Sequence, residues 1–306
     1  MRRYVLQRLA QAVLLALIVA TVVFTLLRLL GGDPAQIIGG PQATEEVKEH
    51  LRERFGLDQP LPTQYGLFLL NALRGDFGIS FLTNQSATGL VLNGLKNTGL
   101  LVLLTVAVAL LLATTTGLMA GARRGRAFDR GMGVVASVLQ SVPAFWFGIL
   151  LVIVLAINLK LFPALGTVTP IGLTLPVLAL AASIFPEQFR LLRASTGQTL
   201  DREYVASARG FGFPERTVLG KYVLKNSVLP LLTVIGLQLG YLLGGAIAVE
   251  VVFDYPGIGT LAQRALLARD FPVIQAITIV SSVAFLVINL IVDLLYRSIN
   301  RRVELS

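Results

Sequence analysis

Three glutamates surround the only histidine of the chain. His50 lies near Glu46, Glu49 and Glu53 in the sequence. One imidazole with nearby carboxylates could bind a divalent metal, but metal sites that do chemistry need several convergent ligands. A charge run of this kind is more often the solvated face of a helix. The sequence therefore favours a solvated helix and predicts neither a metal site nor an intramembrane metalloprotease.

Nucleotide chemistry would require a loop that cradles phosphates. The pattern of a glycine, four variable residues and Gly-Lys-Ser/Thr does not occur in the sequence. Gly220-Lys221 lacks the upstream glycine and is followed by Tyr222. The chain also has no cysteine, which excludes disulfides and thiolate chemistry. We predict no catalytic residue and no cofactor in this chain, so that any ATP and Mg²⁺ would be bound by partner subunits.

Ionisable residues inside apolar stretches mark ion and proton pathways when they lie deep in a membrane. Here Glu250 and Arg28 lie near the outer ends of such stretches, and Glu187, Arg190 and Asp293 lie near inner ends. Glu187 and Arg190 are three residues apart, so they can pair on one helix face. This placement disfavours a proton-coupled secondary transporter and a voltage-gated channel.

The ionisable residues above lie in or beside long apolar stretches, and these stretches determine the class of the fold. Of the 306 residues, 55% are hydrophobic and 14% are charged, against about 25% charged in ordinary globular domains. About 20 apolar residues in a helix cross a hydrocarbon core of roughly 30 Å. Six stretches qualify: Leu9–Leu30, Thr98–Gly121, Gly131–Ile157, Leu173–Leu192, Leu229–Val252 and Val273–Tyr296. We predict an all-α integral membrane protein with a single domain over residues 1–306.

The positive charges predict the orientation of the chain in the membrane. Cytoplasmic loops are enriched in lysine and arginine. With the N-terminus inside, the inner segments hold 17 such residues and the outer segments hold 8, with Arg28 at the outer end of the first span. Both termini and the segment 193–228 are therefore expected in the cytoplasm. The net charge of +9 is then explained by topology, so it does not indicate a nucleic-acid partner.

The first outer segment, Gly31–Asn97, is too long for a plain loop and should form a small extracytoplasmic cap. Thr44 is well placed to cap a short helix. Pro60 and Pro62 should then break the chain before a second short helix from about Gln64 to Leu73. With so few residues, the second helix cannot span a membrane and should lie on its surface or on the bundle.

The inner segment Arg193–Val228 carries the most distinctive pattern. Small residues at Ala206, Ser207 and Ala208 would leave a helix with a shallow surface into which another protein could pack. Gly212 permits a turn, and Pro214 can start a second helix. Residue types alone leave two interpretations open, a docking element or a solvated hairpin that joins two spans.

At this segment the chain resembles the inner-membrane permeases of ATP-binding-cassette importers, in particular the peptide and nickel branch. The family signature of Glu-Ala-Ala, three variable residues and Gly corresponds here to Ala206, Ser207, Ala208 and Gly212, with Leu229-Pro230 closing it. The leading glutamate is alanine here, and the stretch before Leu-Pro is longer, as in the peptide branch. Further matching segments extend over nearly the whole chain: Tyr4–Leu9, Gly32–Ala35, Gly56–Leu61, Arg74–Ser80, Pro143–Trp146, Val249–Phe253, Pro256–Gly259, Arg269–Gln275 and Asn289–Tyr296.

The resemblance implies a type I importer permease in a bacterial or archaeal cytoplasmic membrane. It also implies partners: a second, similar permease that completes the path, two cytoplasmic ATPases and an extracytoplasmic solute-binding protein. The segment that would couple to one ATPase comprises Ala206, Ser207, Ala208, Arg209, Gly210 and Gly212. Its role would be mechanical, so the resemblance implies no catalytic residue either.

The solute is expected to be a di- or oligopeptide or a related small molecule. Glutathione and nickel or other metal chelates stay open as alternatives within the family, and a secondary transporter or a membrane-anchored adaptor as alternatives outside it. The predicted spans contain scattered polar residues that could line a path: Gln140, Ser141, Gln238, Tyr241, Ser281 and Asn289. None of these six can be singled out as a specificity residue.

Overall fold

The computed structural model describes residues 2–29, 34–40, 42–54 and 58–299, and these residues are almost entirely helical. The described residues contain no β-strand, only an isolated bridge between Ile79 and Ser86. The predicted all-α class is confirmed. The chain divides into two compact units, one formed by Met1–Asn97 with Gly257–Leu290 and the other by Thr98–Pro256 with Ile291–Ser306.

Several helices match the predicted spans in position. Three are long and apolar enough to cross a membrane: α5 (Ala87–Ala122), α8 (Pro170–Leu200) and the part Phe271–Leu290 of α14 (Phe271–Ile299). Two bent pairs would also qualify if each counts as one span: Ala127–Ser141 with Ala144–Asn158, and Glu215–Leu231 with Val234–Leu242. In α1 (Arg2–Leu29) the apolar helical stretch is shorter, Leu14–Leu26, and the expected end at Leu30 lies outside the described residues. The count of six spans stays a prediction.

The predicted cap helices form in the first unit. The chain continues from α2 (Pro34–Gly39) to α3 (Glu45–Arg54), where the Thr44 hydroxyl accepts a hydrogen bond from the Val47 amide at 3.5 Å. The second helix, α4 (Leu61–Leu73), begins three residues earlier than expected. Pro60 precedes it and Pro62 lies in its first turn, where a proline needs no amide hydrogen. The two prolines thus start the helix instead of delaying it.

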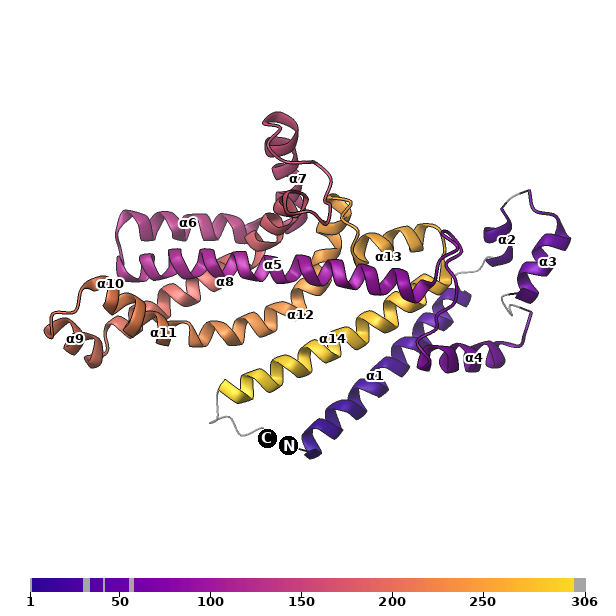
Figure 1. The fold of residues 1–306 in the computed structure, drawn as a ribbon, viewed down its shortest axis with the longest axis horizontal. Coiled ribbons are helices and arrows are strands. Elements are labelled where there is room, and N and C mark those ends of the chain that lie inside the picture. Colours follow the sequence, from indigo (N-terminus) through magenta and orange to yellow (C-terminus); the bar gives the residue numbers. More distant parts are fainter. Residues whose placement is uncertain (1, 30–33, 41, 55–57, 300–306) are drawn as a thin grey trace. The chain divides into compact units, whose positions relative to one another are not determined.

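Aromatic contacts fix α4 on α1 (Figure 1). The Phe24 ring lies 5.2 Å from that of Tyr65 and 5.7 Å from that of Phe68, measured between centroids. The hydroxyl groups of Thr21 and Tyr65 are 2.6 Å apart. As expected, this short helix lies against the bundle.

A buried carboxylate, that of Asp270, links two segments of the same unit that are far apart in the sequence. Helix α13 (Ile258–Leu267) and the start of α14 pack on the first turns of α5 through Val91, Ile258 and Val273, among others. Between these two helices, Asp270 accepts hydrogen bonds from the Ser80 hydroxyl at 2.5 Å and from the amides of Phe81 and Leu82 at 3.1 and 3.2 Å. The carboxylate therefore ties the chain before α5 to the start of α14.

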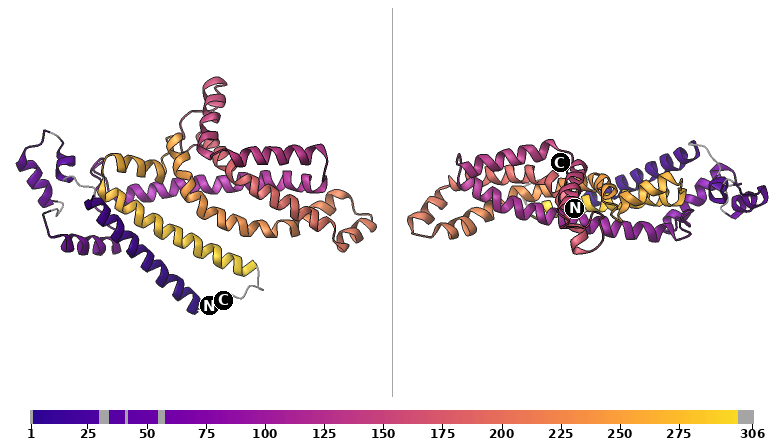
Figure 2. Two further views of the ribbon diagram at one scale, coloured as in Figure 1. Left: turned by 180° about the vertical axis from the view of Figure 1, so that it is seen from behind. Right: turned by 90° about the horizontal axis from the view of Figure 1, so that it is seen from above.

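In the second unit, α5 and α6 (Ala127–Ser141) run side by side against α8, as both Figure 1 and Figure 2 show. Phe185 and Phe189 of α8 stack on each other with centroids 5.7 Å apart and pack against alanines of α5 and α6. Gly121 lets α5 approach α8 closely, since a Cβ atom at position 121 would lie 2.6 Å from the Cβ atom of Thr196 on α8. Arg193 of α8 also donates a hydrogen bond to Asp129 of α6 at 2.8 Å.

The predicted span Gly131–Ile157 is not a single straight helix. It consists of α6, α7 (Ala144–Leu151) and a π-helix η1 (Val152–Asn158), and the direction changes by 105° between α6 and α7. The break lies at Val142 and Pro143, which have extended backbone conformations. Proline disfavours helix in the residue before it, so the bend follows from the sequence at this point. Helix α8, in contrast, stays continuous through Pro176 and Pro186.

Candidate functional site

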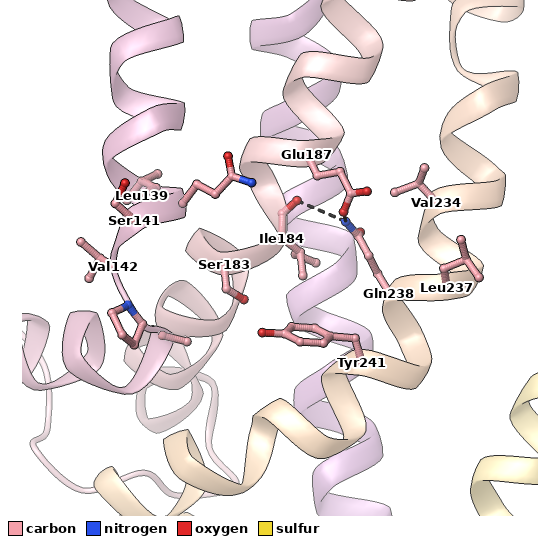
Figure 3. A pocket seen from close by; sticks show the side chains of 13 residues that line it. Leu139, Ser141, Val142, Ser183, Ile184, Glu187, Val234, Leu237, Gln238 and Tyr241 are labelled. Atoms are coloured by element: carbon pink, nitrogen blue, oxygen red, sulfur yellow. Dashed lines mark hydrogen bonds between the residues drawn. The ribbon is translucent and has the colours of Figure 1, made fainter.

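A cavity of about 540 Å³ opens where α6, α7, α8 and α12 (Leu229–Val252) meet (Figure 3). The bend after α6 forms one wall with Val142 and Pro143. Helix α8 contributes Ser183, Ile184 and Glu187, and α12 contributes Val234, Leu237, Gln238 and Tyr241. All of these elements belong to the second unit, so the cavity is built within one compact part of the chain.

Four of the six polar residues predicted for a path line this cavity, namely Gln140, Ser141, Gln238 and Tyr241. They come from two helices that are far apart in the sequence. Ser281 and Asn289 lie on α14, are assigned to the other unit and do not line the cavity. The role of all six in transport stays a prediction.

A chain of side-chain hydrogen bonds runs through the cavity wall. The fully buried Gln188 amide donates to Gln238 Oε1 at 2.7 Å, and Gln238 Nε2 donates to Glu187 Oε2 at 2.8 Å. Gln238 Nε2 also lies 3.5 Å from the carbonyl oxygen of Ile184. Figure 3 shows the Glu187 carboxylate beside the end of the Gln238 side chain. The amide thus holds the carboxylate at the edge of the cavity.

The expected pairing of Glu187 with Arg190 is wrong. The Arg190 guanidinium donates instead to Gln140 Oε1 and, at 3.2 Å, to the Ser137 hydroxyl, both on α6. The helix that carries Glu187 is longer than the predicted span, and the depth of Glu187 in the membrane stays a prediction. Because α8 extends to Leu200 instead of ending at Leu192, Glu187 lies nearer the middle of the helix.

The second candidate site is the hairpin between α8 and α12. It contains α9 (Glu203–Gly210), α10 (Glu215–Thr217), the π-helix η2 (Val218–Val223) and α11 (Leu224–Ser227). As the sequence suggested, Gly212 makes the turn with φ = +77°, a value that favours glycine, and Pro214 precedes the next helix. In Figure 1, α9, α10 and α11 lie together.

Burial separates the small residues of α9 into two groups. Ala206 and Ser207 are exposed, as are Arg209, Gly210 and Gly212. Ala208 is only 4% exposed and packs with Val205, Val218 and Val223 in a small core of the hairpin itself. Val205 and Ala208 are three residues apart and therefore share a helix face. The expectation that Ala208 is part of an outward docking surface was wrong.

The tip of the hairpin exposes aromatic side chains that the sequence analysis did not single out. Phe211 is 83% exposed, whereas Tyr204 and Phe213 are 43% and 44% exposed. In known interfaces, aromatic side chains are often the anchors that contribute most of the binding energy, so Phe211 is a candidate contact residue. The sequence signal was present, since Phe211 lies between two glycines.

An ion pair joins the two sides of the turn that carries Phe211. Two guanidinium nitrogens of Arg209 donate to the two carboxylate oxygens of Glu215, at 3.2 and 2.7 Å. The hydrogen bond that Arg209 donates to Glu215 raises the pKa of Arg209 above its ordinary value. The pair is exposed to solvent, so it contributes little to stability. We infer that it mainly fixes the geometry of the turn.

Comparison with known proteins shows which family the chain belongs to. Residues 113–305 match the family described as "binding-protein-dependent transport system inner membrane component", and residues 1–102 match the N-terminal part of such membrane components. The glutathione transport system permease protein GsiC of Escherichia coli strain K12 is 37% identical over 300 residues, which cover 98% of each chain. The protein of the same name from Shigella dysenteriae serotype 1 matches equally well.

Among solved structures, the crystal structure of an amino acid ABC transporter with histidines is similar, with a TM-score of 0.54. The similarity covers 69% of this chain and 94% of that one, at 20% sequence identity. At this identity the likeness shows the fold alone.

Proposed function

Because the chain belongs to the family of binding-protein-dependent inner-membrane transport components, we propose that it forms half of the translocation path of an ATP-driven importer for peptides. It is a multi-pass inner-membrane permease of the ATP-binding-cassette type, which works with ATPases and a solute-binding protein. A second, homologous permease would supply the other half of the path, and two ATPases would bind ATP and Mg²⁺ and do all of the hydrolysis.

The cavity between α6, α7, α8 and α12 is the observation that carries this proposal. It combines apolar walls with a few polar groups that can orient a ligand, which is how small-molecule sites are built. Its volume of about 540 Å³ lies within the roughly 300–1,000 Å³ usual for ligand pockets. The name of the relative GsiC refers to glutathione, itself a small peptide. Glutathione and metal chelates remain alternative solutes for the same role.

Reconstitution tests the proposal directly. The chain is purified with its genetic neighbours, placed in liposomes, and assayed for uptake of radiolabelled alanyl-alanine, glutathione and a nickel–histidine chelate. We expect ATP-dependent accumulation of at least one of the two peptides. As a control, the chain purified alone should show no ATPase activity. Accumulation of nickel without either peptide would contradict the peptide assignment, and ATP hydrolysis by the chain alone would contradict the role of a permease.

The proposed orientation has a separate test, which the absence of cysteine makes simple. Thr83 and Ser207 are both exposed, and the charge distribution predicts that Thr83 lies outside and Ser207 inside. In spheroplasts, T83C should react with a membrane-impermeant maleimide, and S207C should react only after lysis. The opposite pattern would reverse the topology.

A further inference from the structure

The cavity contains a negative charge without a positive partner. Among the described residues that line it, Glu187 is the only charged one. Its carboxylate accepts one hydrogen bond, from the neutral amide of Gln238 at 2.8 Å. The nearest arginine in the sequence, Arg190, donates instead to Gln140, which itself lines the cavity, and to Ser137. The described part of the chain therefore leaves the charge of Glu187 uncompensated.

The position of this charge leaves it available to a ligand. Glu187 lies on α8, a helix that is long and apolar enough to span a membrane, and its side chain is exposed at the cavity. Ionisable groups within spans face water or a partner of opposite charge, and they mark the paths of substrates and ions. The relay from the buried Gln188 through Gln238 keeps the carboxylate at the cavity edge. A carboxylate held in this way can bind a group that enters the cavity.

The residues that line the cavity indicate which kind of ligand fits there. A divalent cation would need several oxygen ligands with more than one carboxylate, and the described residues contain no group of three or more histidine, aspartate or glutamate side chains that could hold a metal ion. An ammonium group has three donors and no acceptor. The carboxylate of Glu187 and the hydroxyls of Ser183 and Tyr241, which share the cavity, are acceptors suited to it.

We propose that Glu187 is a specificity residue of the path, which binds the ammonium group of the solute, as at the N-terminus of a peptide. The inference rests on the proposed function of the cavity as part of a translocation path. It adds a requirement that family membership does not contain, namely that the solute carries a positive charge at one end. Gln238 acts as the positioning residue for the carboxylate.

Charge can be restored chemically at this position because the chain has no cysteine. In the reconstituted complex, E187C should lower the rate of alanyl-alanine uptake by roughly tenfold or more, as expected when a charged hydrogen-bond partner is lost. Reaction with the anionic 2-sulfonatoethyl methanethiosulfonate should recover much of the rate. Reaction with the cationic 2-(trimethylammonium)ethyl reagent, which is of similar size, should not. The wild-type complex treated with both reagents controls for thiols in the partners.

Further results separate a charge effect at Glu187 from effects of size, assembly or a wrong function. Equal effects of the two reagents would show that size rather than charge matters, and would overturn the proposal. Loss of the second permease on copurification with E187C would also overturn it, because Glu187 would then serve assembly. E187D, which keeps the charge, should retain more uptake than E187Q. Failure of the wild-type complex to transport any peptide would instead refute the proposed function, before the variants are compared.

Discussion

Replacing Phe211 with alanine should detach the ATPases from this chain while the chain itself stays folded. Phe211 is 83% exposed at the tip of the hairpin, so its truncation removes no internal packing. Aromatic anchors at the centre of interfaces typically contribute 2 kcal/mol or more, which is about a 30-fold loss of affinity. We expect F211A to insert normally, to lose ATPase copurification and to lose solute uptake.

A pair of tryptophan substitutions on the same helix separates docking from folding. A206W adds bulk on the exposed face and should overfill the partner groove, at a cost of about 1–3 kcal/mol, without lowering the thermal stability of the isolated chain. A208W adds the same bulk to the hairpin core beside Val205 and Val218, so it should lower that stability. Normal ATPase association and uptake in well-expressed F211A and A206W would show that the hairpin is only a linker.

Substitution of Gly121 by valine should produce a large loss of stability where α5 packs on α8. A Cβ atom at Gly121 would lie 2.8 Å from the carbonyl oxygen of Arg193, in addition to its clash with Thr196. Backbone cannot move aside as a flexible side chain can, so α5 and α8 must separate. We expect the free energy of unfolding to fall by at least the roughly 1–3 kcal/mol typical of overpacking, measured as a lower midpoint of thermal unfolding in detergent.

Gly99 offers a matched control on the same helix. It is exposed, and a Cβ atom there would meet no atom within 4 Å. G99V carries the same change in helix propensity as G121V, a small gain because glycine is the poorer helix former, so the difference between the two isolates the clash. Equal midpoints for the two variants would contradict the close contact between α5 and α8.

The sequence predicted the elements better than it predicted their ends and bends. Long apolar runs determine where helices such as α5, α8 and α12 lie, because length and composition are local properties. The same argument missed the bend after Ser141, although Pro143 gave a local signal for it. It also started α4 too late, since a proline in a first turn and a proline in a loop look alike in sequence.

Side-chain partners were harder to predict than helices. The spacing of Glu187 and Arg190 allows them to pair, yet Gln140 and Ser137 of another helix take the arginine. Ala208 belongs to a run of small residues, but helical geometry turns it inward. The first outcome depends on residues distant in the sequence, which a local pattern cannot supply. The second had a local signal, because Val205 lies three residues before Ala208 and on the same helix face.

The small core of the hairpin has a mechanical consequence. Because Val205 and Ala208 of α9 are packed against Val218 and Val223, we expect a force on α9 to be passed to the rest of the hairpin. The buried hydroxyl of Ser227 also donates to Thr199 Oγ1 at 3.2 Å, which links the hairpin to α8. We therefore expect the hairpin to move as one piece, so that a displacement of its tip reaches α8 and α12, which both line the cavity.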